Sequence, residues 1–158
     1  MRAKILGKYG KKLLALITLV FISANVQAAT IDDVKQNIIT QAKTMGVEPA
    51  IVLSIAKAES GFDQSAKSIS GHIGVFQLSH HTAKNMGLDP YKLEDNIKGG
   101  ITYYKNMYDI FGSVELAVAA YNSGPSAVKR CNNSIPKHSK PFVSRIMSDY
   151  KYYKSIGI

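Results

Sequence analysis

The chain has 158 residues, of which 46% are hydrophobic and 20% are charged, so it can bury one core and does not have the composition of a disordered chain. Its 12 glycines and 5 prolines exclude collagen-like and low-complexity classes. The formal net charge of +9 would suit a nucleic-acid partner only if the charges were clustered on the folded part of the chain.

The first 28 residues have the three-part pattern of a secretory signal peptide. Five Lys and Arg residues without any acid precede an apolar run from Leu13 to Ile22, and small residues lead to Val26-Gln27-Ala28. The ten residues of that run are too few to span a bilayer, which takes about 20. We expect cleavage after Ala28 and an exported protein of residues 29–158 in the periplasm or cell envelope, with an uncleaved anchor as the alternative.

The charge of the exported part is modest. Residues 29–158 contain 15 of the 20 Lys and Arg residues and all 11 Asp and Glu residues, so the net charge of this part is +4. These charges are spread along the chain. No basic run is interleaved with aromatic residues, and we therefore expect no nucleic-acid partner. Cys131 is the only cysteine, which excludes an internal disulfide and leaves either a free thiol or an intermolecular bridge.

Helical periodicity interrupted by Gly and Pro predicts one compact all-α domain without a convincing alternating strand. The expected helices, with their caps, cover 30–46, 49–61, 79–87, 95–112, 113–121 and a last stretch from 141. Thr30 and Asp33 have the spacing of a capping box, and Pro49 is typical of a first helical position. Loops are expected over 62–74 and 131–141.

The glycine pair Gly99-Gly100 falls in the first turns of the fourth expected helix. Each Gly costs a helix about 1 kcal/mol relative to Ala. The pair therefore indicates close packing against a neighbour, or a helix that starts later than the periodicity suggests.

Glu59 is the one residue that breaks the amphipathic pattern. It lies four residues after Ile55 and seven after Val52, on the apolar side of its helix. Burial and the negative end of the helix dipole would both raise the pKa of its carboxyl group. A carboxylic acid that stays protonated near neutral pH is what general-acid cleavage of a glycosidic bond needs. Periodicity alone favours the alternative of a Glu whose stem packs while its head reaches water.

Three separated segments decide between these interpretations of Glu59. They are Ala58-Glu59-Ser60-Gly61-Phe62, Gly71-His72-Ile73-Gly74-Val75-Phe76-Gln77-Leu78 and Ala119-Ala120-Tyr121-Asn122-Ser123-Gly124-Pro125. In this order and spacing the chain resembles the soluble lytic transglycosylases, lysozyme-like enzymes that cleave peptidoglycan, from about residue 49 to residue 150. Asn96-Ile97 with Gly100 is similar to the family segment between the second and third motifs.

The resemblance implies a lysozyme-like helical fold and a role for five residues. Glu59 would be the sole catalytic carboxylate, Ser68 and Gln77 would line the sugar cleft, and Tyr121 and Asn122 would form the opposite wall, with the Tyr121 hydroxyl orienting the acid. The implied reaction cleaves the MurNAc–GlcNAc bond. A single acid protonates the leaving oxygen, and its carboxylate then deprotonates the 6-hydroxyl of the sugar, which closes a 1,6-anhydro ring without water.

Two alternatives differ from this reaction. A muramidase of the two-carboxylate kind needs a second acid. Asp63 is the nearby candidate, although its sequence neighbours are more typical of a turn. The more distant acids Asp89, Glu94 and Asp95 lie at positions where turn and helix-cap roles are expected. A non-catalytic peptidoglycan-binding module would not need Glu59. No metal or other cofactor is expected, because the four His residues lack ligand spacing.

Some positions depart from the family pattern. His72 stands where a small Ala is usual, Val75-Phe76 replaces Leu-Met, and Phe142 and His138-Ser139 replace a frequent Tyr and a frequent Glu-Thr pair. The resemblance therefore predicts the type of reaction more closely than the shape of the glycan-binding subsites. We expect a monomer that acts on peptidoglycan glycan strands. In its small size the protein also resembles the transglycosylases that serve secretion, conjugation or pilus machinery.

Overall fold

A computed structural model describes residues 29–158, and the expected signal peptide at 1–28 lies outside them. The elements are α1 (Ile31–Thr44), α2 (Pro49–Ser60), β1 (His72–Ile73), β2 (Leu78–Ser79), α3 (His80–Asn85), α4 (Leu93–Phe111), α5 (Val114–Ser123), α6 (Pro125–Arg130), the 3₁₀ helix η1 (Lys137–Ser139) and α7 (Lys140–Ser155). The predicted all-α domain is confirmed, with one small hairpin added. Within residues 29–158, none of the helices combines the length and the hydrophobicity that a membrane span requires.

The ends of the first two helices follow their sequence. The Thr30 side chain accepts a hydrogen bond from the Asp33 N–H at 3.1 Å, and Asp33 Oδ2 accepts from the Thr30 N–H at 3.0 Å, so the capping box is confirmed. At the other end of α2, Gly61 has φ +65° and its N–H donates to Lys57 O. Gly tolerates this left-handed conformation, which stops α2 two residues after Glu59.

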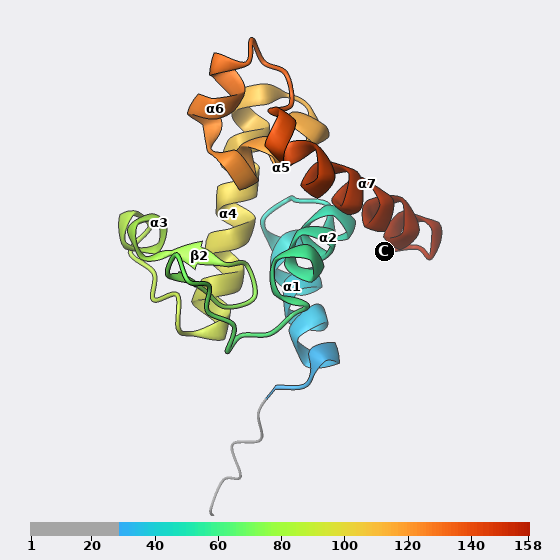
Figure 1. The fold of residues 1–158 in the computed structure, drawn as a ribbon. Coiled ribbons are helices and arrows are strands. Elements are labelled where there is room, and N and C mark those ends of the chain that lie inside the picture. The colour runs from blue at the N-terminus through green and yellow to red at the C-terminus, as the bar shows by residue number, and fades with distance from the viewer. Residues whose placement is uncertain (1–28) are drawn as a thin grey trace, which may run out of the picture.

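The helices surround α4, the longest of them. Figure 1 shows α1 and α2 on one side of α4, the hairpin and α3 on the other, and α5 and α6 at one end of it. Helix α7 returns along α2 and also packs on α5. The largest fully buried side chains are Ile38, Ile51, Leu53, Ile55, Phe76, Ile97, Ile101 and Ile146. The core therefore joins α2 to α4, and both helices carry side chains of the site described below.

The hairpin, α6 and the short 3₁₀ helix η1, which lies in the expected loop 131–141, are the elements that the sequence did not predict. Strands β1 and β2 pair antiparallel, with His72 opposite Ser79 and Ile73 opposite Leu78. Two residues a strand are too few for an alternating pattern, which needs about four. Helix α6 has only six residues and begins at Pro125, directly after the break at Gly124, so periodicity could not reveal it.

The glycine pair packs closely inside α4. The helix begins at Leu93, before the predicted Asp95, so the alternative of a later start is wrong and that of close packing is confirmed. A Cβ on Gly100 would lie 2.1 Å from Cγ of Phe76, and one on Gly99 would lie 2.5 Å from the Cδ1 methyl of Leu78. The hairpin therefore sits directly on the α4 backbone.

We expect Gly100→Ala to lower the free energy of unfolding by roughly 2 kcal/mol or more, because overpacking against a rigid ring exceeds the gain in helix propensity of about 1 kcal/mol. Gly99→Ala is the matched control, since its added methyl meets the end of a Leu side chain that can rotate. Urea unfolding followed by circular dichroism measures both variants. A Gly100→Ala protein as stable as the Gly99→Ala protein would contradict the close contact with Phe76.

Candidate active site

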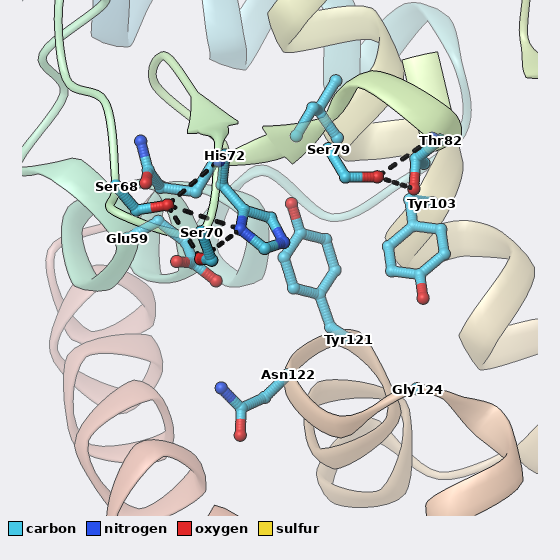
Figure 2. A pocket seen from close by; sticks show the side chains of 12 residues that line it. Glu59, Ser68, Ser70, His72, Ser79, Thr82, Tyr103, Tyr121, Asn122 and Gly124 are labelled. Atoms are coloured by element: carbon cyan, nitrogen blue, oxygen red, sulfur yellow. Dashed lines mark hydrogen bonds between the residues drawn. The ribbon is translucent and has the colours of Figure 1, made fainter. Parts of the chain in front are cut away.

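A cleft of about 420 Å³ lies between the hairpin and α5, a size typical of small-ligand sites. The residues that line it are Glu59, Ser68, Ser70, His72, Gln77, Leu78, Ser79, Thr82, Tyr103, Tyr121, Asn122 and Gly124. The five site residues proposed from the sequence are all among them. Figure 2 shows Glu59, Ser68, Ser70 and His72 grouped on one side and Tyr121 and Asn122 rising from α5.

Glu59 combines burial with a place at the end of a helix. Its half-buried side chain lines the cleft from the last turn of α2. Burial raises the pKa of its carboxyl group to about 7, against an ordinary value of 4.5. The negative end of the helix dipole acts in the same direction. The rise in pKa expected from the apolar position of Glu59 is therefore present.

Arg145 opposes that rise. Its positive charge lowers the pKa of the Glu59 carboxyl, by less than burial raises it. The Nη2 atom donates to Ala58 O at 3.3 Å, which anchors the guanidinium from α7 beside the last turn of α2. Arg145 could not be identified from the sequence, because 86 positions of chain separate it from Glu59 and no motif links them.

Tyr121 is tied to the hairpin rather than to the acid. Its buried hydroxyl donates to the backbone oxygen of Phe76 at 2.8 Å. Burial, and secondly the Glu59 charge, raise the pKa of Tyr121 well above its usual value, so the hydroxyl keeps its proton. That proton satisfies a buried carbonyl group and is not available to Glu59. Tyr121 can therefore orient the acid only through its oxygen lone pairs, as an acceptor from protonated Glu59.

The side-chain amide groups of Asn122 and Gln77 each use one of their two polar atoms in a hydrogen bond within the protein. Asn122 Oδ1 accepts from the Ser139 hydroxyl at 3.0 Å, which leaves its amide NH₂ as a donor toward the cleft. Gln77 Nε2 donates to Gly74 O at 3.0 Å, which leaves its Oε1 as an acceptor. Gln77 also has φ +45°, a conformation uncommon for a residue with a side chain and frequent at functional sites. The two walls thus offer one donor and one acceptor for a polar ligand.

A buried asparagine outside the cleft positions the hairpin. Asn96 on α4 accepts from the Phe76 N–H at 2.8 Å and donates to Ile73 O at 2.8 Å and to Pro90 O at 2.9 Å. Asn96 belongs to the segment that resembles the family between its second and third motifs, but that resemblance predicted no role for it. Two of these hydrogen bonds hold the hairpin backbone that carries Gln77 and His72, and the third holds the loop that precedes α4.

The candidate second carboxylate is engaged in a turn. Asp63 Oδ1 accepts from the Ser65 N–H and the Ser65 hydroxyl, both at 2.7 Å, and these bonds lower the pKa of Asp63. Asp89 likewise accepts from the Tyr91 N–H in a tight turn. The turn interpretation of Asp63 is confirmed. Among the described side chains that line the cleft, Glu59 is the only carboxylate.

The described residues give no sign of a metal centre. No three His, Cys, Asp or Glu side chains within residues 29–158 come together to hold an ion. Cys131, which follows α6, is exposed and is not in a disulfide.

The sequence is similar to those of several bacterial and phage transglycosylases. Membrane-bound lytic murein transglycosylase F of Desulfosudis oleivorans is 32% identical over 92 residues, which are 53% of this chain and 20% of that protein. Membrane-bound lytic murein transglycosylase C of Mannheimia succiniciproducens is 29% identical over 131 residues, 68% of this chain and 36% of that protein. A transglycosylase of Enterobacteria phage PRD1 is 32% identical over 79 residues, which are 49% of this chain and 30% of that protein. The chain thus spans about a third or less of the length of these relatives.

Two solved structures share the fold. An inactive mutant of lytic transglycosylase Slt from Pseudomonas aeruginosa superposes with a TM-score of 0.68 at 23% identity, and the 70 kDa soluble lytic transglycosylase of Escherichia coli with 0.68 at 24%. Each match covers 77% of this chain and 24% of the other. The family model of the transglycosylase SLT domain matches residues 36–141, about two thirds of the chain. The chain therefore belongs to the transglycosylase SLT domain family.

Proposed function

We propose that this protein is a peptidoglycan lytic transglycosylase that cleaves the MurNAc–GlcNAc glycosidic bond. The observation that carries the proposal is the cleft with a single carboxyl group, Glu59, whose pKa of about 7 suits both donating and accepting a proton near neutral pH. The relatives named lytic murein transglycosylases support the same reaction. The substrate is the glycan strand of the cell wall.

In the proposed reaction Glu59 acts twice. Protonated Glu59 gives its proton to the bridging oxygen, the bond from that oxygen to C1 of MurNAc breaks, and an oxocarbenium-like sugar forms. The Glu59 carboxylate then takes the proton of the 6-hydroxyl as O6 bonds to C1. The products are a free 4-hydroxyl on GlcNAc and a 1,6-anhydro-MurNAc end, Glu59 is protonated again, and no water is consumed.

The cleft residues support this chemistry in different ways. The Asn122 amide can donate to a sugar oxygen and Gln77 Oε1 can accept from a sugar hydroxyl. Ser68 lies on the loop between α2 and β1 on the Glu59 side of the cleft. We assign these three residues to substrate binding, Tyr121 to holding the hairpin and the acid in place, and Glu59 to catalysis.

A muramidase on the same fold is the second candidate. Double-displacement or inverting hydrolysis uses two carboxyl groups about 5–9.5 Å apart around the bond. Asp63 and Asp89 are engaged in turns, which favours the reaction with one acid. A module that only binds peptidoglycan would have no use for a carboxyl group whose charged form is destabilised by burial.

We further propose that the protein acts in the cell envelope. The pattern at residues 1–28 supports export with cleavage after Ala28, and two of the relatives are named as membrane-bound. Beside the glycan strands, the partner we propose is a secretion, conjugation or pilus apparatus for which the protein opens the wall locally. N-terminal sequencing of the protein from an envelope fraction should begin at Ala29.

Digestion of purified sacculi should release 1,6-anhydro muropeptides, about 18 Da lighter than hydrolysed ones, because the tethered 6-hydroxyl has an effective concentration far above that of water. Glu59→Gln should lower turnover by about 10²–10⁴-fold or more while the protein stays folded, since an amide cannot donate the proton. Mass spectrometry of the products measures both effects. Reducing-end muropeptides as the main product would indicate the muramidase instead.

The activity should fall above about pH 7, because the general acid must be protonated and the pKa of Glu59 is raised to about 7. Arg145→Gln removes a charge that lowers this pKa, so the falling limb should move to higher pH. The pH dependence of kcat/KM measures the shift. Arg130→Gln, an exposed Arg on α6 that does not line the cleft, is the control and should leave the limb in place. A limb unchanged by Arg145→Gln would contradict the electrostatic effect on Glu59.

A further inference from the structure

A serine–serine–histidine array lies in the cleft beside the acid. Ser70 Oγ is 2.9 Å from His72 Nδ1, and the two serine oxygens are 3.0 Å apart. Ser68 Oγ also accepts from the backbone N–H of His72 at 2.9 Å. All three side chains line the cleft, and Figure 2 shows them grouped next to Glu59. The array is thus a fixed part of the wall.

The protons of the array can be placed so that every partner is satisfied. Ser68 accepts from the His72 N–H and donates to Ser70 Oγ, and Ser70 in turn donates to His72 Nδ1. A neutral imidazole that accepts at Nδ1 carries its proton on Nε2. Nε2 points away from the two serines and into the cleft (Figure 2). With the protons placed in this way, the array presents an N–H donor to whatever occupies the cleft.

The fold itself does not require the His72 side chain. Strand β1 alternates, so that Ile73 is buried while His72 is only half-buried on the cleft side. The pairing of His72 with Ser79 uses backbone atoms, and the backbone N–H of His72 already bonds to Ser68. A smaller residue would preserve these bonds, so the imidazole is free to serve the ligand.

We propose that His72 is a substrate-binding residue whose Nε2–H donates a hydrogen bond to an oxygen of the glycan strand in the cleft. This inference rests on the proposed function and adds a specificity-determining residue to it. Ser70, and Ser68 through it, hold the ring at Nδ1 and set the direction of the donor. A donor fixed in this way loses little conformational freedom on binding, which favours affinity.

Calorimetric titration with a GlcNAc–MurNAc tetrasaccharide tests the assignment in a Glu59→Gln background, which prevents turnover. His72→Ala should raise Kd about three- to tenfold, the range for one lost hydrogen bond between neutral groups. His72→Gln carries an amide N–H at a reach similar to that of Nε2 and should restore most of the affinity. His81→Ala is the matched control, because His81 is exposed on α3 and outside the cleft.

The outcomes separate this inference from the proposed function. Tight binding by the Glu59→Gln parent and equal binding by its folded His72→Ala variant would overturn the role of His72 alone. No binding by the parent would overturn the proposed substrate and the role of His72 together. If His72→Ala fails to fold, His72→Met fills a similar volume without a donor and takes its place, with the same weakening expected.

Discussion

The peptide groups on either side of Phe76 are the points on which the site depends. The N–H of Phe76 donates to Asn96 on α4, and its carbonyl oxygen accepts from Tyr121 on α5, both at 2.8 Å. The ring rests on the bare backbone of Gly100. These contacts tie the hairpin to α4 and α5, and the hairpin carries His72 and the turn that ends in Gln77. Buried hydrogen bonds of this kind are costly to break, because each would leave an unsatisfied polar group.

The same hairpin also meets the acid-bearing helix. Ser60, the residue after Glu59, donates from its hydroxyl to the Val75 carbonyl at 2.9 Å. On the opposite side, Arg145 of α7 donates to the Ala58 carbonyl. The end of α2 is therefore held from two directions, and Glu59 lies between them. Its pKa results from three influences: burial and the helix end raise it, and Arg145 moderates the rise. Precise placement and tuned proton affinity thus come from the same contacts.

Local chemistry was predictable from the sequence where it is encoded by neighbours. The Thr30–Asp33 box, the stop at Gly61 and the apolar place of Glu59 all depend on residues within a few positions of one another, and all are present. The close packing of Gly99-Gly100 was one of two alternatives, and the structure decides it by identifying Phe76 and Leu78 as the neighbours. The five proposed site residues converge on one cleft, although their roles stay proposals.

What the sequence could not reveal depends on contacts between distant segments. The Tyr121 hydroxyl bonds to a carbonyl 45 positions away, and Asn96 bonds to an N–H 20 positions away. Arg145 reaches Ala58 across 87 positions. No local pattern encodes such pairings, and strands of two residues leave no periodicity to detect. The apolar position of Glu59 predicted that its pKa is raised, whereas the size of the shift depends on the assembled surroundings, including Arg145. The most direct measurement is the titration of the Glu59 side-chain carboxyl by ¹³C NMR, with Glu59→Gln identifying its resonance. We expect a midpoint near pH 7, and a midpoint near the ordinary value of 4.5 would contradict the role of Glu59 as the acid that stays protonated near neutral pH.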